Sequence, residues 1–529
     1  MKIDRLSFEE IPQLSAFDKA FQAEDERLKE FIAELPRLEA FPRLISKKSK
    51  SYKHRSLLQT CLLKQYGDIV CTEKAEQHLS NLAKDNCFTI STAHQPVLFT
   101  GPLYFIYKIA GTIHLANKLK LEYPEFDFVP LYWMGSEDHD FEELNQLTLF
   151  GKKLQWEDYQ GGAFGHYQTD SLGPLIESLK SMLGNSPNAD ELKEMIERSF
   201  ISGLNYQESM FRLIHQLFGR FGLIILIPDA SELKKAAKDL FKDDLFNNSS
   251  QKLIAGTSEK LRNAGFSNQA YARSVNLFYL MPGKRERIEK TENGFVVLNS
   301  ELKFSEAEML TELEQHPERF SPNVILRPLY QEMILPNLAY IGGGGELAYW
   351  VERKSQFEYY QVPFPILIRR NSLQWIDKNS QEKMEKLGLN ITDIFKDTEQ
   401  LIRAHIAKNS NETLHFDEER LSIGAIFTKM SEKIKRVDAS LLGNLAAQEA
   451  VLHNALEKLE SKLLKSEKQK QETELNQIRK LQEKLGLPDS LQERKENFMS
   501  LYLSHGSSLF NFLVENLNPL EKDFLIIHD

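Results

Sequence analysis

The chain has 529 residues, 41% of them hydrophobic, so it is long enough and apolar enough to bury a sizeable core. Its 66 basic and 76 acidic residues give a formal charge of −10, which argues against a nucleic-acid-binding protein, because such proteins carry a basic face. The acidic N-terminus lacks the apolar core of a signal peptide, and the longest apolar strings are too short to span a bilayer. We therefore expect a cytoplasmic protein, not bound to membranes, with about three structural units.

The chain contains three cysteines, Cys61, Cys71 and Cys87. They form no CxxC pair and have no spacing typical of a metal site. This pattern favours reduced cytosolic thiols buried as small hydrophobic residues, and we expect no protein-bound metal centre.

Residues 1–85 are expected to form a helical segment, because their apolar residues follow a helical spacing. The pattern then changes to a short strand at 87–91, which runs into the turn Thr92–Pro96. Pro96 disfavours a helix at that turn. A long helix is expected from about 103 to 121, with Pro102 in its first turn.

A second strand is expected at 126–134 and a third at 222–227, each followed by polar residues and a helix. Short apolar strands that alternate with helices indicate a doubly wound α/β core, which we assign to residues 86–371. The less regular stretch at about 145–220 and the β-rich stretch at about 265–320 are expected to be insertions in this core.

The core pattern returns after Val324, with a strand at 338–341, four glycines, a helix at 346–359 and a strand at 364–368. From 372 the chain is expected to be helical as far as 490. The last segment, 491–529, is expected to return to the core.

Residues 444–485 contain no glycine or proline and would form one helix roughly 60 Å long. Leu445, Leu452 and Leu459 repeat every seven positions, which predicts a coiled coil. Its partner is expected to be the helix around 423–442, the same element of a second subunit, or both.

Ligands of open α/β sheets bind at the carboxyl ends of the strands, and three such ends carry candidate site residues here. The loop Gly342-Gly343-Gly344-Gly345-Glu346 joins a strand to a helix, whose free N–H groups suit a phosphate or a carboxylate. It lacks the Lys-Ser/Thr of a Walker loop and the distant acidic residue of a dinucleotide site. The alternative is a tight structural turn.

The second strand end carries Ser136-Glu137-Asp138-His139-Asp140. Asp138, His139 and Asp140 are catalytic candidates that would bind a cation, ribose hydroxyls or an ammonium group, or act as a base. The alternative is a helix start with Ser136 as the N-cap.

The first strand end carries His94 and Gln95, which are either catalytic and binding residues or structural ones. Arg327 and Arg369 are candidates for pairing with anionic ligands, and otherwise they form ordinary salt bridges.

Four segments resemble the BshC family of cysteine-adding enzymes in bacillithiol biosynthesis. They are AHQPVLFTGPLYFIYKI, WMGSEDHDFEELN, RPLYQEMILPNLAYIGGGGELAYW and the C-terminal LQERKENFM. With the coiled coil, the resemblance covers essentially the whole chain.

The resemblance implies a nucleotidyltransferase-type Rossmann-like core with inserted connecting segments, and a C-terminal coiled coil that supports a homodimer. It also implies a ligase that joins L-cysteine to the amine of glucosaminyl malate, giving bacillithiol. We expect ATP to activate the cysteine carboxylate, as an acyl-adenylate or an acyl phosphate, with ADP as a further candidate ligand and Mg²⁺ as a candidate cofactor.

In that reaction the glycine loop would bind phosphate, and His94, Lys108 or an arginine would oppose the developing charge. Asp138, His139 or Asp140 would supply the base. Residues Gln492-Glu493-Arg494 would either form a second nucleotide site or pack the coil onto the core.

Two other functions compete with this one. An enzyme of the same fold would transfer a nucleotidyl group or join another acid and amine. A non-catalytic scaffold would use only the coiled coil.

Overall fold

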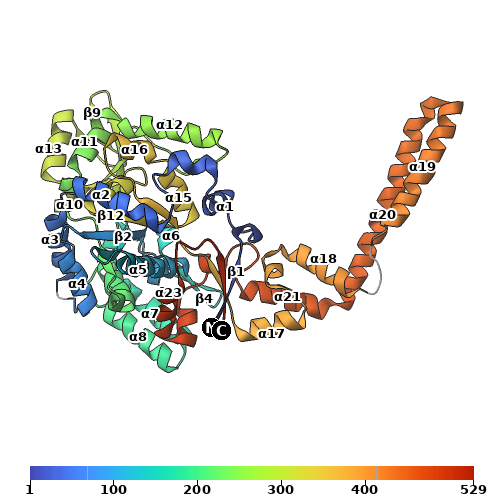
Figure 1. The fold of residues 1–529 in the computed structure, drawn as a ribbon, viewed down its shortest axis with the longest axis horizontal. Coiled ribbons are helices and arrows are strands. Elements are labelled where there is room, and N and C mark those ends of the chain that lie inside the picture. The colour runs from blue at the N-terminus through green and yellow to red at the C-terminus, as the bar shows by residue number, and fades with distance from the viewer. Residues whose placement is uncertain (68, 411–414) are drawn as a thin grey trace.

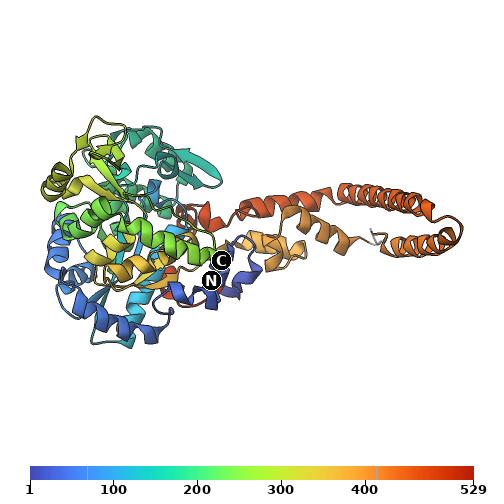
Figure 2. The ribbon, with the colours of Figure 1, turned by 90° about the horizontal axis from the view of Figure 1, so that it is seen from above.

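A computed structural model describes residues 1–67, 69–410 and 415–529. It shows a globular body from which a long helical arm projects (Figures 1 and 2). The body is built on a parallel sheet of order β13-β12-β2-β3-β6. This sheet confirms the predicted Rossmann-like α/β core. Its strands are β2 (Cys87–His94), β3 (Asp127–Met134), β6 (Ile224–Leu226), β12 (Asn337–Gly342) and β13 (Ile366–Arg369).

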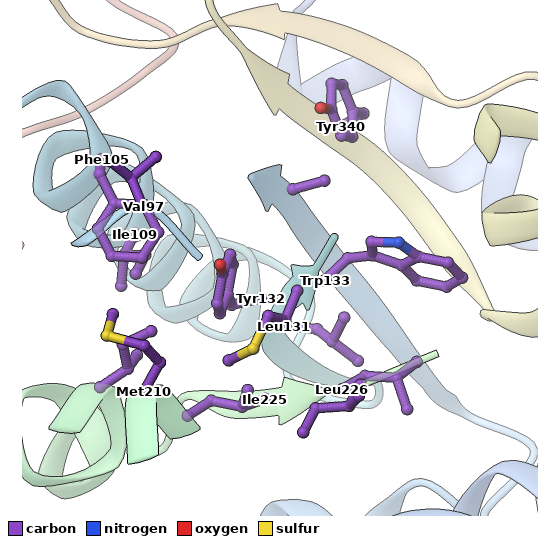
Figure 3. Close-up of a cluster of buried hydrophobic side chains, with 14 of the residues drawn as sticks. Val97, Phe105, Ile109, Leu131, Tyr132, Trp133, Met210, Ile225, Leu226 and Tyr340 are labelled. Atoms are coloured by element: carbon purple, nitrogen blue, oxygen red, sulfur yellow. The ribbon is translucent and has the colours of Figure 1, made fainter. Parts of the chain in front are cut away.

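The strands of this sheet are buried along almost their whole length because helices cover both faces. On β3, Tyr132 packs edge-to-face on Phe105, with 5.2 Å between ring centroids. Its neighbour Trp133 packs on Tyr330, with 5.3 Å between centroids, on the opposite face (Figure 3). Phe105 belongs to α5 (Tyr104–Glu122), and Tyr330 belongs to α14 (Arg327–Ile334). The alternating side chains of one strand thus fix both helices.

The first insertion contributes a hairpin of β4 (Gln146–Leu149) and β5 (Lys152–Gln155), together with three helices. The second contributes an antiparallel sheet of order β10-β9-β8-β7-β11. Its strands are β7 (Leu277–Met281), β8 (Lys284–Thr291), β9 (Gly294–Val297), β10 (Lys303–Phe304) and β11 (Phe320–Pro322).

The remaining helices of the body cover these sheets. They are α1 (Ala16–Gln22), α2 (Phe41–Ser51), α3 (Arg55–Tyr66), α4 (Glu73–Asn81), α6 (Phe141–Leu144), α7 (Gly173–Leu183), α8 (Pro187–Ser199), α9 (Tyr206–Phe218), α10 (Ser231–Ala236), α11 (Lys238–Asn247), α12 (Ser249–Asn263), α13 (Glu306–Gln315), α15 (Gly344–Val351), α16 (Lys354–Tyr359), α22 (Met499–His505) and α23 (Ser508–Asn516).

The two ends of the chain meet in a third sheet, of order β1-β15-β14. Its strands are β1 (Lys2–Leu6), β14 (Leu373–Ile376) and β15 (Phe524–His528). The prediction of purely helical segments at 1–85 and from 372 is therefore wrong at β1 and β14. Their partner β15 lies at the far end of the chain, so no local pattern indicates the pairing.

The arm consists of α17 (Lys378–Lys386), α18 (Thr398–Asn409), α19 (Asp417–Val437), α20 (Leu442–Lys470) and α21 (Glu472–Lys484). α19 and α20 pair within the chain, and Arg420 and Glu460 join them through an ion pair of 2.7 Å. The predicted single helix at 444–485 is broken at Gln471. After the break, Leu475 and Ile478 turn inward and pack with residues of α18.

None of the helices in the described residues is both long and apolar enough to cross a membrane.

Candidate active site

A cavity of about 440 Å³ opens at the carboxyl ends of β2 and β3. The predicted site residues that line it are His94, Gln95, Ser136, Asp138, His139, Arg327 and Glu346. The antiparallel sheet of the second insertion closes the other side, with Phe278 and Arg285. The structure therefore brings residues from all three predicted strand ends to one cavity.

Asp138 is fixed at the edge of the cavity by its neighbours. Gln95 Nε2 donates a hydrogen bond of 3.0 Å to Asp138 Oδ2, and the His139 amide donates one of 2.7 Å to Oδ1. Burial opposes ionisation of this carboxyl group, but Arg285 and the hydrogen bonds outweigh it and lower the pKa of Asp138. Asp138 is thus an ionised acceptor for a ligand hydroxyl or ammonium group.

His139 faces a cation that the sequence did not indicate. The Arg285 guanidinium donates from Nη1 to His139 Nδ1 at 2.8 Å, and it stacks on Phe278 at 4.0 Å from the ring centroid. Burial and Arg285 both lower the pKa of His139. The ring is therefore neutral with its proton on Nε2, so it serves as a hydrogen-bond donor better than as a base.

Asp140, and not Ser136, is the N-cap of the short helix that follows β3. α6 begins at Phe141, and its N-cap is Asp140, whose Oδ1 accepts from the Glu143 amide at 3.4 Å. The expectation of Ser136 as the N-cap is therefore wrong. Ser136 is fully buried in the cavity wall, and its Oγ has no hydrogen-bond partner among the residues that the structure describes. Such a hydroxyl is suited to a ligand contact, whereas Asp140 stands outside the cavity lining.

His94 is held as a neutral imidazole. Its Nε2 lies 3.2 Å from Tyr104 Oη. Burial and the nearby Lys108 ammonium lower the pKa of His94 to about 3. A group with so low a pKa cannot supply a positive charge at neutral pH, so it does not oppose developing negative charge as a cation.

Lys108 acts on the cavity through Glu346. Lys108 Nζ donates to the two carboxylate oxygens of Glu346 at 2.7 and 2.9 Å, and Tyr340 Oη donates to Glu346 Oε2 at 2.6 Å. Burial raises the pKa of Glu346, but Lys108 more than offsets this, and the net shift is downward. Glu346 lines the cavity as a carboxylate, whereas Lys108 is buried behind it.

Of the glycine loop, only Glu346 lines the cavity, and the four glycines before it do not. Gly343 is the N-cap of α15 with a φ of −74°, and none of the glycines at 342–345 has a positive φ. A side chain on Gly344 would meet Asp18, whose Oδ1 lies 2.0 Å from the Cβ position. A Cβ on Gly345 would meet no atom of the described residues within 4 Å. One side of this helix N-terminus is thus taken by the protein's own carboxylate, and the open side is at Gly345.

Two guanidinium groups in the cavity wall have no carboxylate partner within 4.0 Å in the described residues. Arg327 donates to Gln331 Oε1 at 2.9 Å and to Tyr349 Oη at 3.1 Å. Arg285 is buried and donates to Ser321 Oγ at 3.0 Å in addition to His139. Asp138 lies within electrostatic reach of Arg285, and Glu346 lies within reach of Arg327, although neither carboxylate contacts its guanidinium. Both guanidiniums are therefore suited to pairing with an anionic ligand.

The other predicted arginine has a structural role. Arg369 is buried, outside the cavity lining, and donates from Nε to Asp18 Oδ1 at 2.7 Å. Its charge is therefore satisfied within the protein.

The segment Gln492–Arg494 packs the arm onto the body. Gln492 Oε1 accepts from the Trp375 amide at 2.9 Å, and the buried Glu493 accepts from Arg370 at 2.8 and 3.0 Å. Arg494 is exposed. These contacts support the packing interpretation, and they leave Arg494 as the side chain with room for a nucleotide.

Within residues 1–67, 69–410 and 415–529, no group of three or more His, Cys, Asp or Glu is arranged to hold a metal ion.

Comparison with known proteins agrees with the fold described above. Residues 1–371 match the family "Bacillithiol biosynthesis BshC, N-terminal Rossmann-like domain", and residues 373–528 match "Bacillithiol biosynthesis BshC, C-terminal coiled-coil domain". A protein of Flavobacterium psychrophilum is 39% identical over 100% of this chain and 99% of its own. One of Christiangramia forsetii is 38% identical over 100% and 99%, and one of Flavobacterium johnsoniae is 38% identical over the whole of both chains.

These three relatives carry the name "Putative cysteine ligase BshC", so the prediction of a ligase is confirmed at the level of enzyme class. The matches span the Rossmann-like domain and the coiled coil alike. The chain belongs to the BshC family of bacillithiol biosynthesis proteins.

Proposed function

We propose that this protein joins the carboxyl group of L-cysteine to the amine of glucosaminyl malate, forming the amide bond of bacillithiol. The observation that carries the proposal is the cavity in which two guanidiniums without carboxylate partners face ionised carboxylates. Both substrates combine anionic carboxylates with an ammonium group, and such a cavity complements both charges. Membership of the bacillithiol biosynthesis family is the reason for proposing this acid and amine, since the cavity alone would suit other pairs.

Arg285 and Arg327 would bind the carboxylate or phosphate oxygens of the ligand through charge-assisted hydrogen bonds. Asp138 would hold the attacking ammonium group as an ion pair. A protonated amine cannot attack a carbonyl carbon, so the ammonium group must lose a proton before the amide bond forms, and the lowered pKa of Asp138 makes this carboxylate only a transient acceptor of it. His139 would donate from Nε2, and Ser136 Oγ would complete the contacts to the bound ligand.

ATP is the proposed co-substrate, and when bound it supplies the leaving group that a free carboxylate lacks. The groups that fit its phosphates are Arg285, Arg327 and the N–H groups at the open side of Gly345. We propose that any Mg²⁺ arrives on those phosphates, since Mg²⁺ commonly binds with one or two carboxylates and substrate phosphates.

A homodimer through the arm is part of the proposal. Leu452, Leu459 and Leu463 on α20 are 43%, 50% and 40% exposed although α19 lies beside them. A second arm would cover such leucines in the manner of a coiled coil. The other proposed partners are cysteine, glucosaminyl malate and a nucleotide. We propose that the protein acts in the cytoplasm and binds neither nucleic acid nor membranes.

Asp138 and Asp140, two positions apart, give a matched test in a strain from which the gene for this protein is deleted. Asp138→Asn should fail to restore bacillithiol and should leave glucosaminyl malate accumulated. Asp140→Asn should restore it, because asparagine is an equally good helix N-cap. Thiol profiling by mass spectrometry measures both. An unchanged thiol pool in the deletion strain itself would refute the proposed reaction and would point to another acid and amine.

A further inference from the structure

A second cavity, of about 500 Å³, lies on the other side of Glu137. Glu137 lines both cavities, so they adjoin at this residue. Its other walls come from residues 160–167 of the first insertion, from Asp229 after β6, from the turn between β7 and β8, and from Glu318. Neither the predicted strand-end motifs nor the roles assigned above use this cavity, apart from Glu137 itself.

One wall of the second cavity consists of hydrogen-bond acceptors. The carboxylates of Glu137, Asp229 and Glu318 line it, and an ionised carboxylate only accepts hydrogen bonds. Burial opposes their ionisation at Asp229 and Glu318, yet hydrogen bonds lower the pKa of both groups below the usual range. These groups therefore remain ionised at neutral pH.

The cations near this wall are already paired. Lys234 is fully buried and forms an ion pair with Glu137. Arg319 is paired with Glu312 at 2.7 Å. His166 Nε2 lies 3.3 Å from Asp229 Oδ2, and about half of the His166 side chain is exposed. Asp229 Oδ2 also accepts from Gln207 at 3.2 Å, and Glu318 Oε2 accepts from Ser231 Oγ at 3.0 Å. A carboxylate has about four lone-pair sites, so these groups can still accept hydrogen bonds from a ligand. The cavity therefore favours ligands rich in hydrogen-bond donors and disfavours anions.

Several other residues of the lining are apolar. They are Leu280, Met281 and Pro282, and Tyr167 adds an aromatic ring. A ligand that is complementary to both kinds of lining has O–H or N–H groups on its edges and C–H groups on its faces. A pyranose ring has this distribution.

The two adjoining cavities thus differ in charge. The first combines the guanidiniums of Arg285 and Arg327 with carboxylates. In the second, carboxylates predominate, and its guanidinium, Arg319, is paired with Glu312. We propose that the second cavity binds the hydroxyl groups of the sugar ring of the acceptor substrate, while the amine of that sugar reaches past Glu137 to Asp138 and the carboxylates of the substrate lie in the first cavity. Asp229, His166 and Glu318 are the sugar-binding residues, and Glu137 stands where the two ends meet. This inference rests on the proposed function and adds the place of the sugar.

Calorimetry with two fragments tests the assignment. Methyl glucosaminide carries the hydroxyls and the amine without a carboxylate, and malate carries the carboxylates without the sugar. Asp229→Asn should weaken binding of methyl glucosaminide and of glucosaminyl malate about tenfold to a hundredfold, the usual effect of losing a hydrogen bond to a charged group. Malate binding should change less than about twofold. Asp239→Asn, an exposed aspartate on α11, is the matched control and should change neither.

Glu318→Gln is the second variant, because its side chain is 40% exposed and the fold depends on it less. If both variants bind glucosaminyl malate as the unmodified chain does, the sugar does not lie in this cavity. Product formation separates the two proposals. When the unmodified chain forms bacillithiol and Asp229→Asn leaves the KM for glucosaminyl malate unchanged, only the placement of the sugar is refuted. When the unmodified chain forms none, the proposed function itself fails.

Discussion

The buried ion pair between Arg370 and Glu493 should contribute strongly to the stability of the junction between the arm and the body. Glu493 Oε1 accepts from Arg370 at 2.8 Å and from Ser372 Oγ at 3.0 Å, and Oε2 accepts from Arg370 at 3.0 Å and from the Leu373 amide at 3.1 Å. The side chains of the pair are only 3% and 0% exposed. Glu493→Gln keeps the shape but leaves a buried guanidinium without its anion, which costs about 3–5 kcal/mol.

Hydrogen exchange of the amides in β14 and β15 is the appropriate assay, because these strands lie beside the broken contact. A loss of about 3–5 kcal/mol should speed their exchange roughly a hundredfold to several thousandfold. Arg494→Gln, at the exposed neighbour, should leave exchange unchanged. The double change Arg370→Met with Glu493→Leu should recover much of the loss, because it removes both charges together.

The same pair should make exchange depend on pH. Burial opposes ionisation of Glu493, but Arg370 lowers its pKa overall. A depressed carboxylate pKa gives stability that is present above the unfolded pKa and is lost as the pH falls through the folded one. Protection of β14 should therefore decline on acidification in the unmodified chain and not in Glu493→Gln. If Glu493→Gln lowered nucleotide affinity and left exchange unchanged, the segment would be a ligand site and our reasoning would be wrong.

Three further predictions concern the cavity and the arm. Arg285→Met should weaken binding of carboxylate ligands about tenfold to a hundredfold by calorimetry, whereas Arg287→Met, exposed on the same strand, should not; equal affinities would remove Arg285 from the site. Lys108 holds the pKa of Glu346 down against the effect of burial, so Lys108→Met should move the acidic limb of the pH–rate profile to higher pH, and an unmoved limb would contradict this role. Leu459→Lys should turn a dimer into a monomer in sedimentation experiments, and a monomeric unmodified chain would rule out the proposed dimer.

The sequence predicted the central sheet well because its strands are buried on both faces. The run Phe126–Met134 is apolar except for Asp127, and the observed β3 is Asp127–Met134. A fully buried parallel strand leaves such a continuous apolar run, and polar residues begin where the strand leaves the core. The end of the run therefore marked the position of Asp138 and His139 at the cavity.

Contacts between distant segments could not be predicted in the same way. Arg285 lies on β8 between Lys284 and Glu286, in a strand rich in charged residues, and nothing local separates it from them. Only the folded arrangement brings it within 2.8 Å of His139. The occupant of one side of the glycine loop could not be predicted for a related reason, since Asp18 lies more than 300 residues away in the chain.

The position of Arg285 also bears on the proposal that the acidic turn after β3 binds the substrates. Without a nearby cation, burial would raise the pKa of Asp138 and favour its neutral form. Arg285 reverses that shift and holds the neutral ring of His139 with its donor on Nε2. The Rossmann-like core thus supplies Asp138 and His139, and Arg285 of the inserted sheet influences the protonation of both. Because the same insertion lines the second cavity through Met281 and Pro282, a shift of this sheet relative to the core would alter both cavities together. We therefore expect selectivity for the acid and the amine to depend on the insertion more than on the strand ends that the sequence made visible.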